Sequence, residues 1–351
     1  MQSLWRSDEM TTALVYSEKY LEHNPGEGHP ERPERLKAIV DALKRAKLWG
    51  APKVKVIEPR PTKRDDIELV HDPSHVELVE RLSKFEKPLD GDTPVRKNTY
   101  ELALLAAGGT IDAGRVVLSG DALNAFALVR PPGHHATQAR GGGFCYFNNL
   151  AVMIERLKRE FKLRRVFILD FDAHHGNGTQ NIFYDDPSVL YMSLHQDPLT
   201  LYPGTGFIDE VGSGKGNGYT VNVPLPPESG DAEYMGAMKE IFVPLTEQFK
   251  PELFAVSAGF DAYVDDPLTQ LRLSTLAYGW LTRFVVEQAE RLCKGRVVFV
   301  LEGGYVPDAL AEGVVNVAKT LTGEKPSTSV EPRRTSVIDE LKRVLSSYWK
   351  L

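Results

Sequence analysis

Short apolar runs alternate with longer segments of helical periodicity along most of the chain. Runs rich in β-branched and other apolar residues predict buried strands over 13–16, 54–57, 125–129, 166–169, 189–193, 219–223, 253–257 and 297–301. Helical spacing of apolar residues predicts helices over 36–43, 66–86, 100–118, 148–161, 231–249, 274–293 and 307–321. Because strands and helices alternate, the pattern predicts an α/β fold with a mostly parallel sheet and helices on both faces.

A glycine pair and the C-terminal segment add detail to this predicted fold. Adjacent Gly108 and Gly109, inside the helix predicted over 100–118, indicate close packing against a neighbour. Residues 324–335, EKPSTSVEPRRT, have the composition of a linker between a main domain, 1–323, and a C-terminal helix within 336–351. We expect Ser336 to cap this helix. Its apolar face should pack on the domain or at the subunit contact of a homo-oligomer, and consists of Val337, Leu341, Val344, Leu345 and Tyr348.

Composition narrows the class of protein. With 351 residues, 42% hydrophobic and 26% charged, the chain can form one large α/β domain or two smaller ones. A net charge of −6 and the lack of a basic stripe argue against a nucleic-acid partner. No apolar run approaches the roughly 18 residues of a membrane helix, and residues 1–10 lack the apolar core of a signal peptide. The two cysteines, Cys145 and Cys293, make no disulfide framework, so we expect a cytoplasmic protein.

The strand over 166–169 changes character abruptly at its carboxyl end. Asp170, Asp172 and His174 follow at alternate positions, so in extended chain they share one face. Burying these groups is costly unless something pairs with them, and a divalent metal is the simplest partner. Taken alone, the pattern also fits a capping or salt-bridge cluster. Asp261 directly follows the strand over 253–257 and would complete three ligands with an open fourth position, as in a catalytic zinc site.

A second set of polar residues follows the neighbouring strands. Two carboxylate ligands neutralise much of the metal charge and acidify a bound water less, so a general base is expected beside the metal. His134 and His135, after the strand over 125–129, fit that demand. Asp170 and Asn177 are available to orient the two imidazoles, and the hydroxyl of Tyr305 could donate to a developing oxyanion.

Six motifs carry a resemblance to a known family. They are RPPGHHA, GGGFCYFNN, DFDAHHGNGTQ, YPGTG, GFDAYVDDP and LEGGY. In order and spacing they resemble the zinc-dependent histone deacetylase family, and the similarity runs from residue 29 to about residue 315. GHPERPERL, HHGNGTQ and LEGGY look like the class II branch and its prokaryotic amidohydrolase relatives. The resemblance implies the three-layer arginase/deacetylase fold, with a central sheet of about eight strands.

The resemblance also implies roles for individual residues. One zinc ion would be bound by Asp172, His174 and Asp261, and catalysis would use His134, His135, Tyr305, Asp170 and Asn177. The substrate would contact Asp92, Gly143, Phe144, Tyr202, Leu268 and Gly303, and Arg35 would border the product channel. One potassium ion would lie at Asp170, Asp172, His174, Ser193 and Leu194, and a second at Phe183, Val189 and Tyr219.

The implied reaction is hydrolysis of an acyl amide, and several alternatives remain open. The substrate would be an N-acyl-lysine side chain of a peptide or protein, or a similar small acylated amine. An acetylpolyamine amidohydrolase is the nearest alternative, but Leu268 replaces the acidic gatekeeper of a polyamine enzyme and the loop over 87–98 is short. A binuclear manganese ureohydrolase is disfavoured because Gly176 stands where a second-metal aspartate is needed. A non-catalytic acyl-binding subunit should have lost Tyr305, a histidine of the pair or a metal ligand, and this sequence keeps all of them.

Overall fold

The computed structural model describes residues 11–326 and 330–351; residues 1–10 and 327–329, where the signal-peptide and part of the linker predictions fall, lie outside this description. An eight-stranded sheet forms the centre, in the order β2-β1-β3-β8-β7-β4-β5-β6. Every pair is parallel, as predicted. The strands are β1 Thr12–Val15, β2 Val54–Ile57, β3 Asn124–Ala127, β4 Val166–Asp170, β5 Val189–Gln196, β6 Thr220–Leu225, β7 Leu253–Ala258 and β8 Val297–Leu301.

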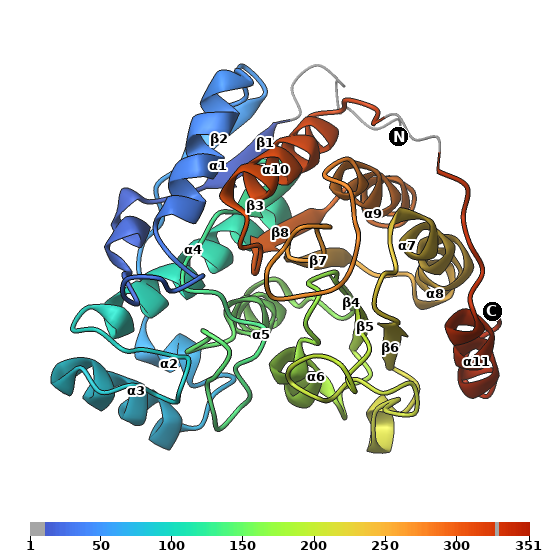
Figure 1. Cartoon of the computed structure of the whole chain (residues 1–351), viewed down its shortest axis with the longest axis horizontal. Helices are drawn as coiled ribbons and strands as arrows, with labels where there is room; N and C mark the ends of the chain where they lie inside the picture. Colours follow the sequence, from blue (N-terminus) through green and yellow to red (C-terminus); the bar gives the residue numbers. More distant parts are fainter. Residues whose placement is uncertain (1–10, 327–329) are drawn as a thin grey trace.

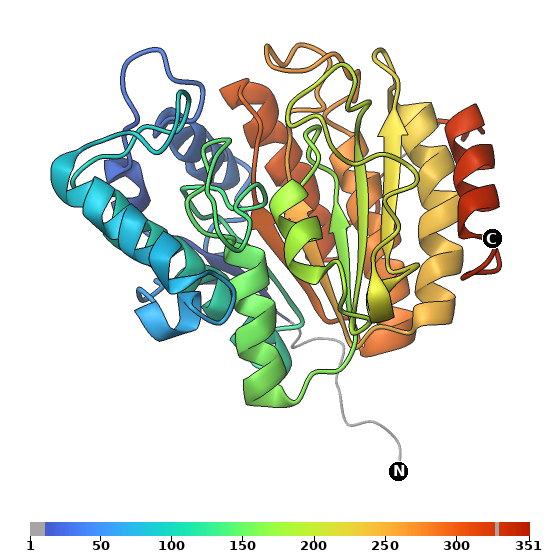
Figure 2. The same cartoon turned by 90° about the horizontal axis from the view of Figure 1, so that it is seen from below.

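Helices cover both faces of this sheet, which makes three layers. The helices are α1 Glu34–Arg45, α2 Arg64–Ile67, α3 Pro73–Phe85, α4 Thr99–Ser119, α5 Asn149–Phe161, α6 Asn177–Phe183, α7 Asp231–Ala237, α8 Val243–Phe249, α9 Ala277–Cys293, α10 Pro307–Leu321 and α11 Ser336–Leu345. Figure 1 shows α1, α10 and α9 side by side on one face, and α4 and α5 together on the other. Figure 2 shows the two helical layers flanking the strands from another side. Because β4 is buried at every position, its apolar run needs no alternation.

One predicted helix is interrupted and another runs on through a π-helical turn, and a proline lies at each place. The segment predicted as one helix over 66–86 forms α2 and α3, and Pro73 begins α3 because it cannot donate the hydrogen bond of a helix interior. The segment over 231–249 forms α7 and α8 with a π-helical turn, Met238–Phe242, between them. Pro244 lies in the first turn of α8, where its missing N–H costs nothing.

The C-terminal helix α11 packs on the sheet edge at β6. Ile338, Leu341 and Leu345 are fully buried there. The prediction that Ser336 caps the helix is wrong, because Thr335 is the cap and its side chain accepts the N–H of Ile338. Tyr348 lies beyond the end of the helix and is 41% exposed, so it does not belong to the buried face.

Helix α4 corrects one prediction from composition. It is the one helix of the described residues that is long and apolar enough to cross a membrane by length and composition, so the statement that no run approaches this length is wrong. However, 67% of its most apolar segment is buried inside the protein. It packs on β1, β3 and α5, and a helix covered on most sides is apolar around most of its circumference. Its place in the core therefore accounts for its composition.

The glycine pair of α4 makes the close contact that the sequence predicted. A Cβ atom on Gly108 would lie 2.0 Å from the carbonyl oxygen of Arg60, and one on Gly109 would lie 2.6 Å from the hydroxyl of Tyr20. We expect Gly108→Ala to lower the free energy of unfolding by about 2 kcal/mol, because backbone must move to admit the methyl group. Chemical denaturation measures this change. Gly91→Ala is the control, since no heavy atom lies within 4 Å of its added Cβ. Equal stability of the two variants would contradict the close contact.

Candidate active site and metal centre

The polar segments singled out in the sequence follow five adjacent strands, β3, β8, β7, β4 and β5. His134 and His135 come after β3, Tyr305 after β8, Asp261 after β7, and Asp172 after β4. Parallel strands end at the same edge of a sheet, so these loops converge. The sheet order, which cannot be read from chain order, brings β3 and β4 within reach of each other through β8 and β7.

Asp172, His174 and Asp261 form a buried group that could hold a metal ion. Each offers a ligand atom, and these atoms all lie within 4.8 Å of one another. His174 Nδ1 is 2.9 Å from Asp261 Oδ2 and 3.2 Å from Asp172 Oδ1. Backbone amides orient the two carboxylates: the N–H of Gly303 donates to Asp172 and the N–H of Ala173 donates to Asp261, both at 2.8 Å. The donors therefore already converge on one point.

The charge of this group fits a divalent cation. Two carboxylates are buried beside a single imidazole, which leaves negative charge that needs a partner. Burial would lower the pKa of His174, but hydrogen bonds to Asp172 and Asp261 raise it to about 10. The carboxylates thus attract positive charge to the point between them. Two oxygen donors and one nitrogen donor, with a position left open, match the ligand set of a catalytic zinc site.

The two adjacent histidines have different partners. His134 donates from Nδ1 to Asp170 Oδ2 at 3.1 Å, and His135 donates from Nδ1 to Asn177 Oδ1 at 2.8 Å. Their ring centroids are 4.0 Å apart. With Nδ1 as the donor, Nε2 of each ring is free to exchange a proton with a substrate. The partners inferred from the sequence are therefore the ones that the structure places beside each ring.

These partners separate the pKa values of the two rings. Burial would lower the pKa of His134, but the charges of Asp172 and Asp170 raise it to about 10. Burial lowers the pKa of His135 well below its usual value, and the neighbouring His134 and His174 lower it further. At neutral pH and without a metal, His134 is thus the protonated ring and His135 the neutral one. One ring is suited to donate a proton and the other to accept one.

A cavity of about 240 Å³ reaches the metal ligand His174 and His135 of the histidine pair. It is lined by Asp92, His135, Gly143, Phe144, His174, Leu201, Tyr202, Leu268 and Tyr305. All but Leu201 were identified from the sequence. The rings of His135 and Tyr202 meet at 5.0 Å, and those of Phe144 and Tyr305 meet at 5.9 Å. Aromatic walls around a polar floor suit a ligand with an apolar stem and a polar reacting end.

Comparison with known proteins identifies the family. Residues 29–321 match the model of the histone deacetylase domain. The chain belongs to the histone deacetylase family. It is 43% identical over 359 residues to a probable deacetylase of Archaeoglobus fulgidus, covering 97% of this chain and 99% of that protein. It is 41% identical over 285 residues to the histone deacetylase-like amidohydrolase of Pseudomonas aeruginosa, covering 79% and 73% of the two proteins.

Solved structures agree with this assignment. The crystal structure of the HD domain of HDA15 superposes with a TM-score of 0.89 at 35% sequence identity, and the match covers 97% of both chains. The three-layer fold expected from the resemblance is therefore the histone deacetylase fold. As a member of this family, the protein is a hydrolase, and its Asp172, His174 and Asp261 fit the metal site that the family implies.

Two predicted residues of this histone deacetylase family member lie behind the cavity. Gly303 contacts the metal ligands, and a Cβ atom there would lie 2.3 Å from Asp261 Oδ2. Arg35 is fully buried and donates to the backbone oxygens of Gly304 at 2.7 Å and of Glu302 at 2.5 Å. Its guanidinium lies 5.1 Å from the ring centroid of Tyr305. Both residues therefore support the loop after β8 and do not line the cavity.

The residues predicted for potassium lie on neighbouring segments. Asp170 on β4 pairs with Ser193 on β5, and Leu194 follows. Farther from the cavity, Phe183 ends α6, Val189 begins β5, and Tyr219 precedes β6. The backbone oxygen of Tyr219 accepts the N–H of Tyr191 at 2.9 Å.

The sequence reasoning missed two buried carboxylates of the site. Glu302 follows β8, and its Oε2 accepts the backbone N–H groups of Gly133 at 2.7 Å and His134 at 3.2 Å. Burial raises its pKa to about 7. Asp266 accepts the backbone N–H of Tyr305 at 2.8 Å. Glu302 belongs to the LEGGY motif and Asp266 to the GFDAYVDDP motif. Neither motif indicates which backbone N–H group its carboxylate will accept.

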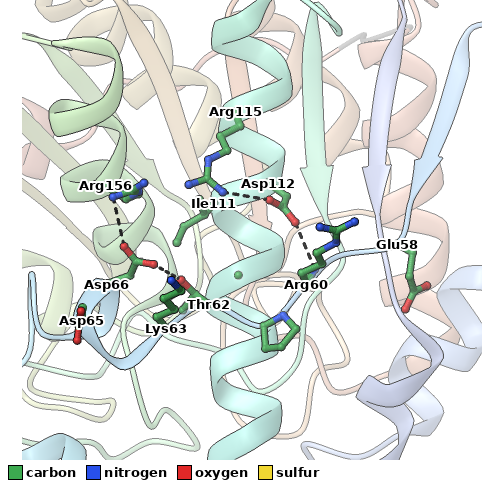
Figure 3. Close-up of a pocket in the computed structure, with 12 residues that line it drawn as sticks. Glu58, Arg60, Thr62, Lys63, Asp65, Asp66, Ile111, Asp112, Arg115 and Arg156 are labelled. Atoms are coloured by element: carbon green, nitrogen blue, oxygen red, sulfur yellow. Dashed lines mark hydrogen bonds and ion pairs between the residues drawn. The ribbon is translucent and has the colours of Figure 1, made fainter.

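A larger hollow of about 590 Å³ lies elsewhere, between the loop over 58–66 and helices α4 and α5 (Figure 3). Figure 3 shows charged residues of this hollow paired with one another, including Asp66 with Arg156 at 3.6 Å and Asp112 with Arg115 at 3.5 Å. None of the three metal ligands lines it. In this histone deacetylase family member the smaller cavity therefore holds the candidate active site.

Proposed function

We propose that this protein is a zinc-dependent deacetylase that removes acetyl or related acyl groups from N-acyl-lysine side chains or similar small amides. The observation that carries the proposal is the meeting of three groups at one cavity. His174, which forms one buried group with Asp172 and Asp261, lines this cavity together with His135 and Tyr305. Amide hydrolysis needs an electrophile, a proton acceptor and an oxyanion donor. A metal held by the three ligands would be the electrophile, His135 the proton acceptor and Tyr305 the oxyanion donor.

The metal would be held by the two carboxylates and the imidazole. When bound, a zinc ion supplies Lewis acidity toward the amide carbonyl and lowers the pKa of water. The backbone donors Gly303 and Ala173 keep each carboxylate pointed at this position. Such second partners fix ligand geometry before the metal arrives.

The protein's own side chains would perform the proton transfers. His135, which is neutral, accepts the proton of the attacking water at Nε2. His134, whose Nδ1 donates to Asp170, supplies the proton that the leaving amine needs. The Tyr305 hydroxyl donates a hydrogen bond to the carbonyl oxygen as negative charge develops on it. Asp170 and Asn177 orient the two rings throughout.

The walls of the cavity favour an acyl-lysine substrate over a polyamine. Phe144 and Tyr202 present rings to the stem of the substrate, and Leu268 adds an apolar contact at the mouth. Asp92 is the exposed carboxylate of the rim and can accept a hydrogen bond from the substrate backbone. The apolar side chain of Leu268 offers no charge interaction that would favour binding of a polycation. An acetylpolyamine amidohydrolase is therefore the second candidate.

We also propose that potassium binds beside this centre. The first ion would lie at the paired ends of β4 and β5, near Asp170, Asp172, His174, Ser193 and Leu194. A second would lie near Phe183, Val189 and Tyr219. Buried carboxylate and carbonyl oxygens are ligands that hard cations prefer.

Comparison of two substrates tests the proposed function. We expect an acetyl-lysine peptide to be hydrolysed with a higher kcat/KM than acetylputrescine, with activity lost to a chelator and restored by zinc. Leu268→Glu should raise kcat/KM for acetylputrescine about tenfold, because a carboxylate at the mouth attracts the free ammonium group. Leu268→Gln is the control of equal size without the charge.

The opposite ranking of the two substrates would support the polyamine candidate. Hydrolysis of neither, with zinc bound, would favour a non-catalytic acyl-binding protein. Equal rates with and without chelator would contradict the metal centre.

A further inference from the structure

The backbone just before Tyr305 consists of two glycines, which allow it many conformations. Gly303 and Gly304 precede it, and Gly304 has a φ of +116°, a conformation that favours glycine. The ring of Tyr305 is contacted by the edge of Phe144 and by the guanidinium of Arg35. Arg35 also donates to the backbone oxygens of Glu302 and Gly304, so it holds carbonyl groups before Tyr305 but not the N–H of Tyr305 itself. An oxyanion donor must be held to within a fraction of an ångström, so its backbone needs an anchor from elsewhere.

Asp266 supplies this anchor and holds a second loop at the same time. Its Oδ2 accepts the backbone N–H of Tyr305 at 2.8 Å, across 39 residues of chain. Its Oδ1 accepts the backbone N–H of Leu268 at 3.0 Å. The side chain is only 5% exposed. One buried carboxylate thus joins two residues that line the cavity from different loops.

The loop that carries Asp266 is itself tied to the metal centre. The hydroxyl of Thr269 donates to the backbone oxygen of Asp261 at 2.6 Å. The N–H of Asp266 donates to the oxygen of Tyr263 at 3.0 Å, and the N–H of Val264 donates to the oxygen of Leu273 at 3.1 Å. Asp266 therefore links the backbone of Tyr305 to the loop that carries the metal ligand Asp261.

We propose that Asp266 is a positioning residue that sets the Tyr305 hydroxyl against the metal centre, while its other carboxylate oxygen holds the backbone of Leu268. This inference rests on the proposed function, because it assumes that Tyr305 stabilises the oxyanion. Asp266 does not line the cavity, so it acts only through the backbone groups that it holds.

A double-mutant cycle between Asp266→Asn and Tyr305→Phe tests the inference. Asparagine keeps the shape of the side chain but offers one acceptor oxygen for two N–H donors. We expect Asp266→Asn to lower kcat on an acetyl-lysine peptide about tenfold, because a hydrogen bond to a buried carboxylate is lost. In the Tyr305→Phe background the same change should lower kcat by less than about twofold, since no hydroxyl remains to be misplaced. Zinc content and Tm are measured for every variant.

Asp265→Asn is the matched control, because this neighbouring aspartate is exposed and lies outside the site. If Asp266→Asn does not fold, Asp266→Ser, which keeps one acceptor in a smaller side chain, takes its place in the cycle. An equal loss of kcat in both backgrounds, or no loss in either, would overturn the inference and leave the proposed function intact. Full activity of Tyr305→Phe alone would overturn the inference and the oxyanion role of Tyr305, whereas absence of hydrolysis by the unaltered, zinc-loaded protein would overturn the proposed function.

Discussion

Asp261→Ala is expected to abolish zinc binding and, with it, hydrolysis of an acetyl-lysine peptide. The carboxylate is fully buried, its Oδ2 lies 2.9 Å from His174 Nδ1, and among the described residues it belongs to the group of three that could hold the metal. Loss of one of three ligands should weaken zinc affinity by at least about 10³-fold, because zinc binding depends on the complete ligand set. Zinc content by elemental analysis and turnover of the peptide measure the two effects.

Asp265→Ala is the control for this variant, since it removes a carboxylate from the same loop at an exposed position. It should keep its zinc and its activity. Circular dichroism separates loss of metal from loss of fold. An Asp261→Ala protein with one zinc per chain and normal turnover would remove Asp261 from the ligand set.

Tyr305→Phe should lower kcat by about 10²–10³-fold, the usual cost of removing one oxyanion donor. The ring would keep its contacts with Phe144 and Arg35, so KM, zinc content and Tm should change little. Because only the hydroxyl is lost, the effect should fall on kcat and not on substrate affinity. Steady-state kinetics on an acetyl-lysine peptide measures the split.

Tyr348→Phe provides the comparison for this change. It also removes one phenolic hydroxyl, which donates to Asn217 at the protein surface. Its rate should equal that of the unaltered protein. Near-full turnover of Tyr305→Phe would show that its hydroxyl does not stabilise the oxyanion.

Much of the site could be predicted because its residues are tied to strand ends. Asp172 and His174 stand at alternate positions directly after a buried strand, and Asp261 follows another, so they converge in a parallel sheet in which β4 and β7 are neighbours. The aromatic walls and the partners of the histidines required the family resemblance. No spacing in the chain relates His135 to Asn177, which lie 42 residues apart.

Contacts between a side chain and the backbone of a distant segment could not be predicted from the sequence. Asp266 and Glu302 were missed because the groups they hold are backbone N–H groups, which every residue but proline possesses. The break at 68–72 was missed because the apolar spacing continues past it, although Pro73 is a local signal for the start of a helix.

The order of strands also governs when the site can assemble. β3, which leads to the histidine pair, and β4, which leads to Asp172, are separated in the sheet by β8 and β7, the last two strands to be made. At a spacing of about 4.8 Å per strand, the gap they fill is about 14 Å wide. A nascent chain that ends before residue 253 therefore holds two of its metal ligands but has no closed sheet to bring them to the histidines. We therefore expect zinc to bind late in folding, after β7 and β8 have inserted between β3 and β4.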